Sequence, residues 1–597
     1  MAVAETDPYL VPGPHSLATT RRWVRAAIVL GVAYVVYRAA FTLDGAAPDA
    51  GVLLLTAEAL TLAVFAIRAN AAWCDADPGV DMPDAPVPAT TVVIDARDAT
   101  IADLRATLLS CRRLRGSEQV IVADPDANPE VDTLAGRFGA PVVPTAALDA
   151  AADASAMWVL LIRAGDLPLP DALELLATAC SAPDAGIVQL GVEHANPSSF
   201  EHDPSGGWSL APFEHQIVRP SLAARGTMLW YGDVPAMVRP AAIRDSVEEG
   251  TSTVVAGLQA MSRGYRVTMM PRTLARLRGP ASLGESLRRR FEQTAEIRRR
   301  APQAIRLAPG PVRRQFIGAL ADPLAAVQRF MLALVAVLAL GLGRLPVAGS
   351  ALPLTGAAAL AYGVRWQAQT MLGRGRLGRF RVLRSELRSI GVDLAFGHGL
   401  GVRHGRHRLL LLTGMSVAVA LAAGVGAMAV WKDSPERLPA IASAVALILS
   451  AGYLIVAADV IVDASARRQV RSDHRVRLGL VTGRLGDLDG QLRDISVGGL
   501  GLTLTGDAAE LPPIGSHTTV SFRIPDADGA WRDVETAVRI AHVAAAGDQE
   551  HRVGMAFLAP TSAALDPVVE FLTIDRRLVA LGRRAPSAGE EAWPGLV

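Results

Sequence analysis

The stretch Asp494-Ile-Ser-Val-Gly-Gly499 decides the fold of the C-terminal part of this 597-residue chain. Around it, apolar and polar residues alternate as they do in β-strands, and the segments 518–524 and 534–543 flank the turn Asp526-Ala-Asp-Gly529 like the arms of a hairpin. This part of the chain is therefore predicted to be an all-β domain. The other elements expected here are a strand at 553–558, a closing helix at 565–581 and a disordered tail at 583–597.

A run of arginines precedes these strands. The segment Arg467-Arg-Gln-Val-Arg-Ser-Asp-His-Arg475 contains an RxxxR pair, the hexapeptide at 494–499 is a DxSxxG, and Val553-Gly-Met-Ala-Phe557 follows both. In this order the three motifs resemble the PilZ domain, a small β-barrel that is a receptor for cyclic di-GMP. The resemblance covers 468–575, and we assign 465–582 to this domain.

The resemblance implies a ligand site with a clear chemical basis. Arginine can place two N–H groups on one phosphate and can stack its plane on a purine. The carboxylate of Asp494 can accept the N–H groups of a guanine edge, Ser496 can add a hydroxyl contact, and Gly499 leaves room for the ligand. These arginines could instead follow the last of several membrane-spanning helices and simply mark its cytosolic side, as the positive-inside rule predicts. The DxSxxG motif favours a ligand site. The residues expected to bind cyclic di-GMP are Arg467, Arg468, Arg471, Arg475, Asp494, Ser496 and Gly499.

The composition indicates a membrane protein. Hydrophobic residues make up 51% of the chain and the mean hydropathy is +0.29. The net charge of +1 does not indicate nucleic-acid binding, and no nucleic-acid partner is expected. About twenty apolar residues are needed for a helix to cross a bilayer. Six windows qualify, giving about six transmembrane helices: 24–43, 51–70, 325–343, 346–364, 409–431 and 437–460.

The arginines also predict the orientation of these spans. Arg21, Arg22 and Arg25 precede the first window, and the connection at 44–50 has no basic residue. The segment 365–408 is rich in arginine. Because basic residues stay on the cytosolic side, both termini are expected in the cytosol. The expected location is the bacterial inner membrane, with a cytosolic N-terminal tail at 1–23 and a pair of helices within 24–70.

The segment 311–464 is predicted to hold the remaining four transmembrane helices and one amphipathic helix at about 375–395. Apolar residues recur there at helical spacing, and arginines cover the rest of the surface. Such a helix can lie in the lipid headgroup region; the alternative is a basic helix packed on the cytosolic domain. The apolar positions are Phe380, Leu383, Leu387, Ile390 and Leu394.

The segment 88–310 alternates short β-branched runs with helical stretches, which predicts an α/β domain with a mostly parallel sheet. Ile187-Val-Gln-Leu-Gly, followed by Asn196-Pro, and Ser262-Arg-Gly-Tyr265 resemble motifs of the catalytic subunit of bacterial cellulose synthase. The resemblance implies a glycosyltransferase-A-like domain of a family-2 processive enzyme that uses a UDP-sugar and a divalent metal. The expected strands lie at 91–94, 119–123, 158–162 and 187–190.

Most catalytic motifs of that family are degenerate here. Arg163-Ala-Gly165 stands where the metal-binding DAD motif is expected, and Thr251-Ser-Thr253 replaces the TED motif that supplies the base. The QxxRW motif keeps only its arginine, Arg290. Sugar transfer needs a base and a metal or its equivalent. No catalytic residue is therefore assigned and no metal is expected; if the domain were active, Asp124, Asp166, Arg290 and Mg²⁺ would be its groups.

Two functions remain open. One is an inactive glycosyltransferase homologue that senses cyclic di-GMP and regulates or scaffolds an active polysaccharide synthase or another envelope machine. The other is a diverged but active UDP-sugar-dependent processive transferase that cyclic di-GMP activates. The expected partners are cyclic di-GMP, the lipid bilayer and another membrane protein.

Overall fold

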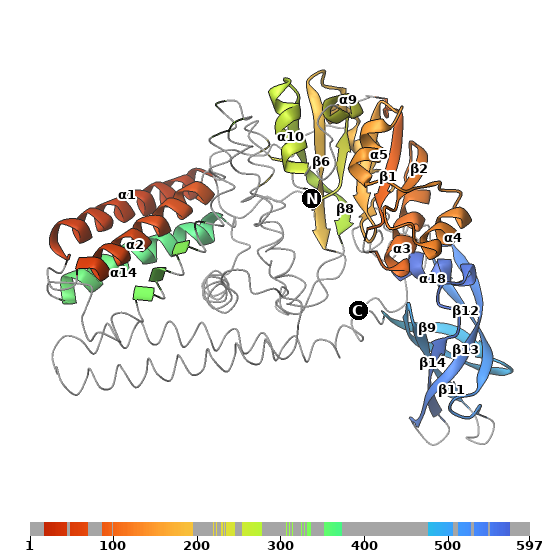
Figure 1. Ribbon diagram of the computed structural model, residues 1–597. Helices are drawn as coiled ribbons and strands as arrows, with labels where there is room; N and C mark the ends of the chain where they lie inside the picture. Colours follow the sequence, from red (N-terminus) through yellow and green to blue (C-terminus); the bar gives the residue numbers. More distant parts are fainter. Residues whose placement is uncertain are drawn as a thin grey trace, which may run out of the picture.

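The computed structural model places an α/β domain, a β-barrel and a group of long helices (Figure 1). The residues it describes are 17–43, 48–69, 86–97, 99–194, 234–244, 253–277, 351–372, 476–505, 511–526, 530–546 and 550–572, with single positions between 219 and 232 and between 306 and 335. Among the predicted features, Arg290, the arginines at 467–475, the 375–395 helix and the tail at 583–597 lie outside these residues.

The α/β domain contains an eight-stranded mixed sheet in the order β3-β2-β1-β4-β7-β6-β8-β5. β1 pairs in parallel with β2 and β4, whereas β7 is antiparallel to both β4 and β6. The sheet is therefore Rossmann-like along one half, and the strands expected from the β-branched runs are confirmed as β1, β2, β4 and β6. The strands are β1 (Thr90–Asp95), β2 (Ser117–Ala123), β3 (Val142–Val143), β4 (Trp158–Arg163), β5 (Leu167–Pro168), β6 (Ala185–His194), β7 (Ala236–Val238) and β8 (Arg266–Leu277).

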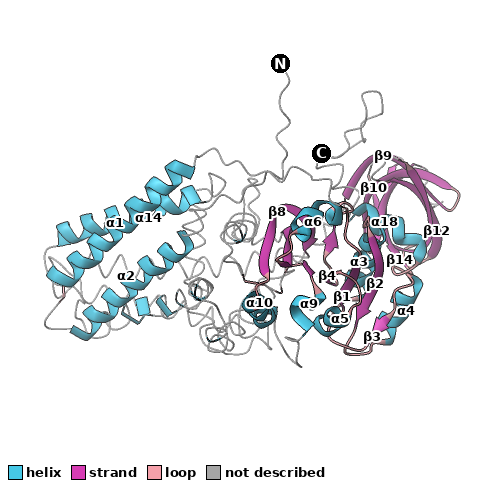
Figure 2. Ribbon diagram, turned by 90° about the horizontal axis from the view of Figure 1, so that it is seen from above, coloured by secondary structure: helices cyan, strands magenta, loops and turns pink. Residues whose placement is uncertain are grey.

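Helices cover both faces of this sheet (Figure 2). Successive side chains of β1 point to opposite faces, so Val92 and Ile94 join the core on one face and Val93 joins the core on the other. Burial on both faces explains why the strands are continuous apolar runs. The helices are α3 (Ile101–Arg112), α4 (Pro129–Arg137), α5 (Ala147–Asp153), α6 (Ala172–Ser181), α9 (Pro240–Ile243) and α10 (Thr253–Ser262).

The C-terminal strands form a closed barrel in the order β10-β11-β14-β13-β12-β9. Closure leaves no unpaired edge, and alternate residues of every strand fill the interior with leucine, isoleucine, valine and phenylalanine. The predicted hairpin is confirmed as β12 and β13, and the predicted closing helix begins as α18. The elements are β9 (Val476–Leu485), β10 (Leu488–Ser496), β11 (Gly499–Thr505), β12 (His517–Pro525), β13 (Trp531–Ala545), β14 (Glu550–Phe557), the 3-10 turn η5 (Ala563–Leu565) and α18 (Asp566–Glu570).

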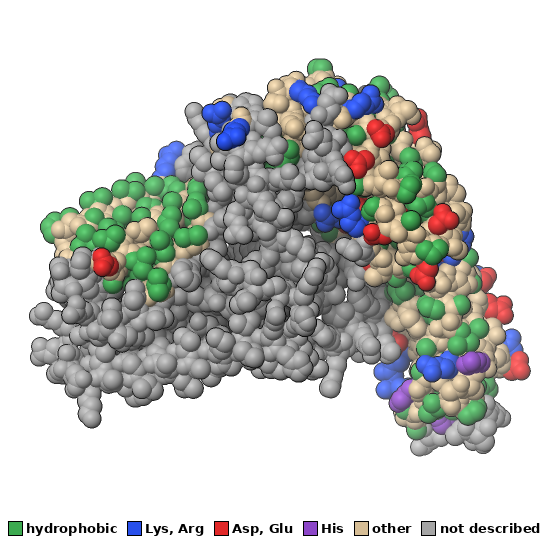
Figure 3. Space-filling view, in the orientation of Figure 1, with side chains coloured by type: hydrophobic (Ala, Val, Ile, Leu, Met, Phe, Trp, Pro, Cys, Tyr) green, Lys and Arg blue, Asp and Glu red, His purple; other side chains and the backbone are tan. Residues whose placement is uncertain are grey.

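Three long helices, α1 (Leu17–Phe41), α2 (Pro48–Ala69) and α14 (Ala351–Leu372), lie side by side (Figures 1 and 2). Their outer surface is strongly apolar (Figure 3). Inside the group, Glu58 accepts hydrogen bonds from Arg38 at 3.0 Å and from Tyr34 at 2.7 Å. A buried charge needs such partners, so these contacts fix α1 against α2.

Two helices among the described residues are long and apolar enough to cross a membrane, Ala18–Phe41 and Asp49–Ile67. They correspond to the first two predicted windows. The window 346–364 overlaps α14, which is not one of the two; Arg365 and two glutamines make its second half polar. Most of the window 325–343, and all of 409–431 and 437–460, lie outside the described residues. Within the described residues, the structure thus supports two of the six predicted spans and not the one at 346–364.

Two cysteines lie in the core of the α/β domain, and we predict that their thiols are inert. Burial raises the pKa of Cys111 on α3 to about 12; burial also raises that of Cys180 on α6 to about 12, with Arg239 partly opposing the shift. At pH 8 a thiol with such a pKa is ionised in about one molecule in ten thousand.

Neither cysteine should react with a maleimide at pH 8 until the protein is unfolded in guanidinium, as measured by peptide mass spectrometry. Ser181→Cys, at an exposed neighbouring position, is the control that should react at once; rapid labelling of either native thiol in the folded protein would contradict the prediction.

Candidate functional site

The DxSxxG motif forms the tight connection between β10 and β11. Ser496 and Gly499 are the last paired residues of this hairpin, and the Ser496 hydroxyl donates a hydrogen bond to the Gly499 carbonyl oxygen at 3.0 Å. The hydroxyl therefore closes the turn, and its lone pairs stay available to accept a hydrogen bond. Val497, at the tip, is exposed.

The structure gives a reason for Gly499 that differs from the predicted one. A Cβ atom at this position would lie 2.1 Å from the carbonyl oxygen of Met555 on β14. The glycine is thus required by the close approach of β14, before any ligand is considered. At Gly501 a Cβ atom would lie 3.1 Å from the Asp494 carboxylate, so this second glycine makes room for that carboxylate.

A row of four residues crosses the outside of the barrel. Asp494 is paired with Gly501, Gly501 with Gly554, and Gly554 with His542. Asp494 follows a bulge in β10, and a bulge re-aims the side chain next to it. The row therefore has a carboxylate at one end, an imidazole at the other and a floor of glycines between them.

A second row lies beside the first. It runs from Gly499 through Ala556 to Arg539 and His517. Arg539 and His542 are exposed, and neither takes part in an ion pair within the part of the chain that the structure describes. Sequence analysis missed both residues, because only the register of β13 against β14 brings them beside the DxSxxG hairpin.

Asp124 and Asp166, the two carboxylates predicted for an active transferase site, accept hydrogen bonds from backbone N–H groups of neighbouring residues. Asp124, at the end of β2, is 2% exposed and accepts hydrogen bonds from the backbone N–H groups of Asp126 at 3.2 Å and Asn128 at 2.7 Å. Asp166, in the loop after β4, accepts from the backbone N–H of Arg163 at 2.9 Å. Among the described residues, no group of three potential metal ligands is found. Both carboxylates therefore hold backbone N–H groups, and Arg163 lies beside Asp166 in the same loop.

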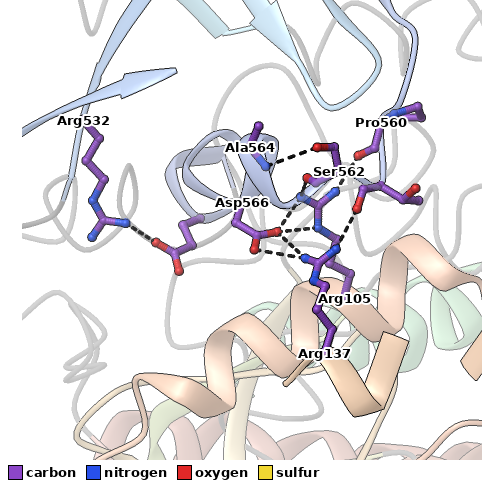
Figure 4. A network of polar contacts seen from close by, with 9 residues as sticks. Arg105, Arg137, Arg532, Pro560, Ser562, Ala564 and Asp566 are labelled. Carbon is purple, nitrogen blue, oxygen red and sulfur yellow. Dashed lines mark hydrogen bonds and ion pairs between the residues drawn. The ribbon is translucent and has the colours of Figure 1, made fainter. Parts of the chain in front are cut away.

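A network of arginines joins the α/β domain to the barrel (Figure 4). Arg105 on α3 is 2% exposed, and its Nε donates to the Asp566 carboxylate at 2.8 Å. Its two terminal nitrogens donate to the carbonyl oxygens of Pro560 and Ser562, and one of them also reaches Asp566. All three nitrogens of a buried guanidinium therefore have acceptors on the barrel side, which is what burial of a charge requires.

Two further arginines of the α/β domain extend this contact. Arg137 on α4 donates to both oxygens of Asp566, at 2.9 and 3.0 Å, and to the carbonyl oxygen of Thr561 at 2.8 Å. Arg113, after α3, donates to Glu570 at 3.1 Å. Glu570 also accepts from Arg532 on β13, so the last residue of α18 is held by both domains. The segment from Pro560 to Glu570 is thus the docking element of the barrel.

The sequence of the C-terminal barrel matches a known domain family. Residues 465–573 match the PilZ domain family, so the C-terminal barrel is a PilZ domain. The chain as a whole combines this domain with a Rossmann-like mixed sheet. No curated protein matches the chain in sequence.

Three solved structures illustrate what the chain is similar to. Mannosyltransferase PcManGT from Pyrobaculum calidifontis is 19% identical over 56% of this chain and 99% of its own, with a TM-score of 0.37. Glucosyl-3-phosphoglycerate synthase from Mycobacterium tuberculosis is 16% identical over 36% of this chain and 76% of its own, with a TM-score of 0.24. S. aureus TarS is 10% identical over 78% of this chain and 72% of its own, with a TM-score of 0.23.

If Asp124 has a structural role, removing its carboxylate should destabilise the domain. Asp124→Ala leaves the N–H groups of Asp126 and Asn128 without their acceptor, and we expect a loss of roughly 1–3 kcal/mol in the free energy of unfolding. The measurement is the unfolding midpoint of the full chain. The matched control is Asp126→Ala, whose exposed side chain should change the midpoint little. Equal midpoints for the two variants would show that the Asp124 carboxylate does not stabilise the loop.

Proposed function

We propose that this protein binds cyclic di-GMP through its PilZ domain. The observation that carries the proposal is the arrangement on the outside of the barrel, where Asp494 and Ser496 face a glycine floor. A flat floor suits a planar base, and a carboxylate can accept the N1–H and N2–H₂ groups of guanine. On the far side Arg539 provides a cationic side chain and His542 an imidazole that can donate a hydrogen bond, which suit the phosphates of the ligand.

The predicted arginine motif directly precedes β9 in the sequence, and β9 pairs with the strand that carries Asp494. β9 begins at Val476, which pairs with Ile495 of the DxSxxG motif. Arg475 directly precedes Val476 in the sequence, and Arg471 lies four residues before Arg475. This connection supports the proposal that Arg471 and Arg475 bind the ligand phosphates against the Asp494 surface.

We propose further that the chain is an inactive glycosyltransferase homologue. The α/β domain is proposed to be glycosyltransferase-A-like, on the basis of its mixed sheet and the sequence motifs. Arg163 ends β4 where a metal ligand is expected, and Thr253 begins α10 where a carboxylate base is expected. Transfer of a sugar without a base and without stabilisation of the leaving diphosphate is slower by orders of magnitude.

The proposed role is regulatory or scaffolding. The docking of the PilZ domain on α3 and α4 supports a path from the ligand site to the α/β domain, and the two apolar helices support anchoring in the bacterial inner membrane. A partner in the membrane, such as an active polysaccharide synthase or another envelope complex, would then receive the signal.

Calorimetry on the purified chain tests the ligand. Binding of cyclic di-GMP at micromolar affinity or better is expected, and Arg471→Ala and Arg475→Ala should each cost roughly 1.5–3 kcal/mol because each removes charge-assisted hydrogen bonds. Arg523→Ala is the matched control, since this exposed arginine of β12 pairs with Asp533 on β13, and β9 separates β12 from β10. Absence of binding heat, or equal affinity in the double arginine variant, would refute the ligand assignment.

Incubation with UDP-sugars tests the loss of catalysis. We expect neither hydrolysis nor transfer by the purified protein, with or without Mg²⁺, because Arg163 repels a metal and Thr253 cannot act as a base. Release of UDP is the measurement. Turnover that Asp166→Asn abolishes would instead establish an active transferase.

A further inference from the structure

Helix α3 carries polar side chains on two opposite sides. Arg105 contacts the PilZ domain, whereas within the α/β domain Thr107 contacts the loop between β4 and β5 and Ser110 contacts Pro168 of β5, directly after that loop. An α-helix turns by about 100° per residue, so the side chains of Arg105 and Thr107, two positions apart, point to nearly opposite sides of the helix. The same short helix therefore holds two different partners.

The contacts with the β4–β5 loop are buried and specific. The Thr107 hydroxyl accepts a hydrogen bond from the backbone N–H of Gly165 at 2.8 Å and donates one to the carbonyl oxygen of Asp166 at 2.9 Å. The Ser110 hydroxyl donates to the carbonyl oxygen of Pro168 at 2.7 Å. Both hydroxyls are at most 1% exposed, so no water replaces them, and the loop can only keep these bonds if α3 stays in place.

The loop itself depends on this support. Gly165 has φ of +98°, which favours glycine, and the Asp166 carboxylate closes the turn on the N–H of Arg163. The loop follows β4 at the carboxyl edge of the parallel strands, the edge at which α/β domains bind their ligands. A change in the position of α3 thus alters a loop at the edge where a sugar nucleotide or a partner protein would bind.

We propose that α3 transmits the docking state of the PilZ domain to the loop at 163–168. The proposal rests on the proposed function, because cyclic di-GMP is the signal expected to change PilZ docking. When the barrel is docked, Arg105 is buried with all its nitrogens bonded. When the barrel moves away, Arg105 loses these acceptors and α3 loses the contacts that hold it from the barrel side, so α3 can shift against the loop. Docked and undocked arrangements are then two states, and the ligand changes their populations.

Hydrogen exchange of the full chain without ligand tests the connection first. Arg105→Leu and Asp566→Asn both weaken docking, and each should make the backbone N–H groups of 560–570 and of 163–168 exchange about tenfold faster. Thr107→Val should accelerate only the 163–168 segment, because it removes the loop contact and leaves the docking contacts in place. The control is Asp533→Asn, which breaks an exposed ion pair elsewhere on the barrel and should change neither segment.

Two results would overturn the proposal. One is faster exchange at 560–570 with unchanged exchange at 163–168 in both docking variants; the other is unchanged exchange at both segments, which would show that Arg105 does not hold the barrel. Cyclic di-GMP is then added at saturation. It should alter exchange at 163–168 in the wild-type chain and not in Arg105→Leu. If calorimetry shows no ligand binding, the proposed function fails, while the comparison without ligand still decides whether α3 connects the two segments.

Discussion

The buried guanidinium of Arg105 constrains the arrangement of the two domains. A charge with 2% exposure is tolerated only when every N–H group finds an acceptor, and here the acceptors are Asp566 and two carbonyl oxygens of the barrel. Removing the Asp566 carboxylate while the barrel stays docked would leave the charge buried without its ionic partner, at a cost of several kcal/mol. The α/β domain therefore presents a face that is complete only with the PilZ domain in place, and α3 becomes part of both domains at once.

The local pattern of the sequence predicts much of the fold. Alternation of polar and apolar residues identifies the β12–β13 hairpin, because one face of each strand is buried. Runs of β-branched residues identify β1, β2, β4 and β6, because these strands are buried on both faces. The docking of the domains is not predictable in this way. Arg105 lies in a helix with ordinary amphipathic spacing, and two of its acceptors are main-chain carbonyl oxygens, which any sequence provides. The row that places His542 opposite Asp494 likewise depends on strand register across four strands.

The candidate sites differ in how far sequence motifs predict their chemistry. At the barrel, the DxSxxG motif lies in the β10–β11 hairpin with Asp494 and Ser496 in β10, and Gly499 is required by the close approach of the Met555 carbonyl oxygen. In the α/β domain, Asp124 and Asp166 were candidates because the resemblance to the transferase family implies carboxylates in these two segments. The structure shows them closing turns, an equally common task for a carboxylate beside free N–H groups. Residue type and position alone do not separate these two uses.

The central claim is that buried ionic contacts hold the PilZ domain in one position on α3 and α4. The most direct measurement is the distance distribution between spin labels at Asp132→Cys on α4 and Thr519→Cys on β12, two exposed positions in the two domains. The native cysteine outside the described residues, Cys74, is replaced first. The account predicts one narrow distribution in the otherwise wild-type chain and a broad one when Arg105 is changed to leucine. A broad distribution before that change, or a narrow one that survives it, would contradict the account.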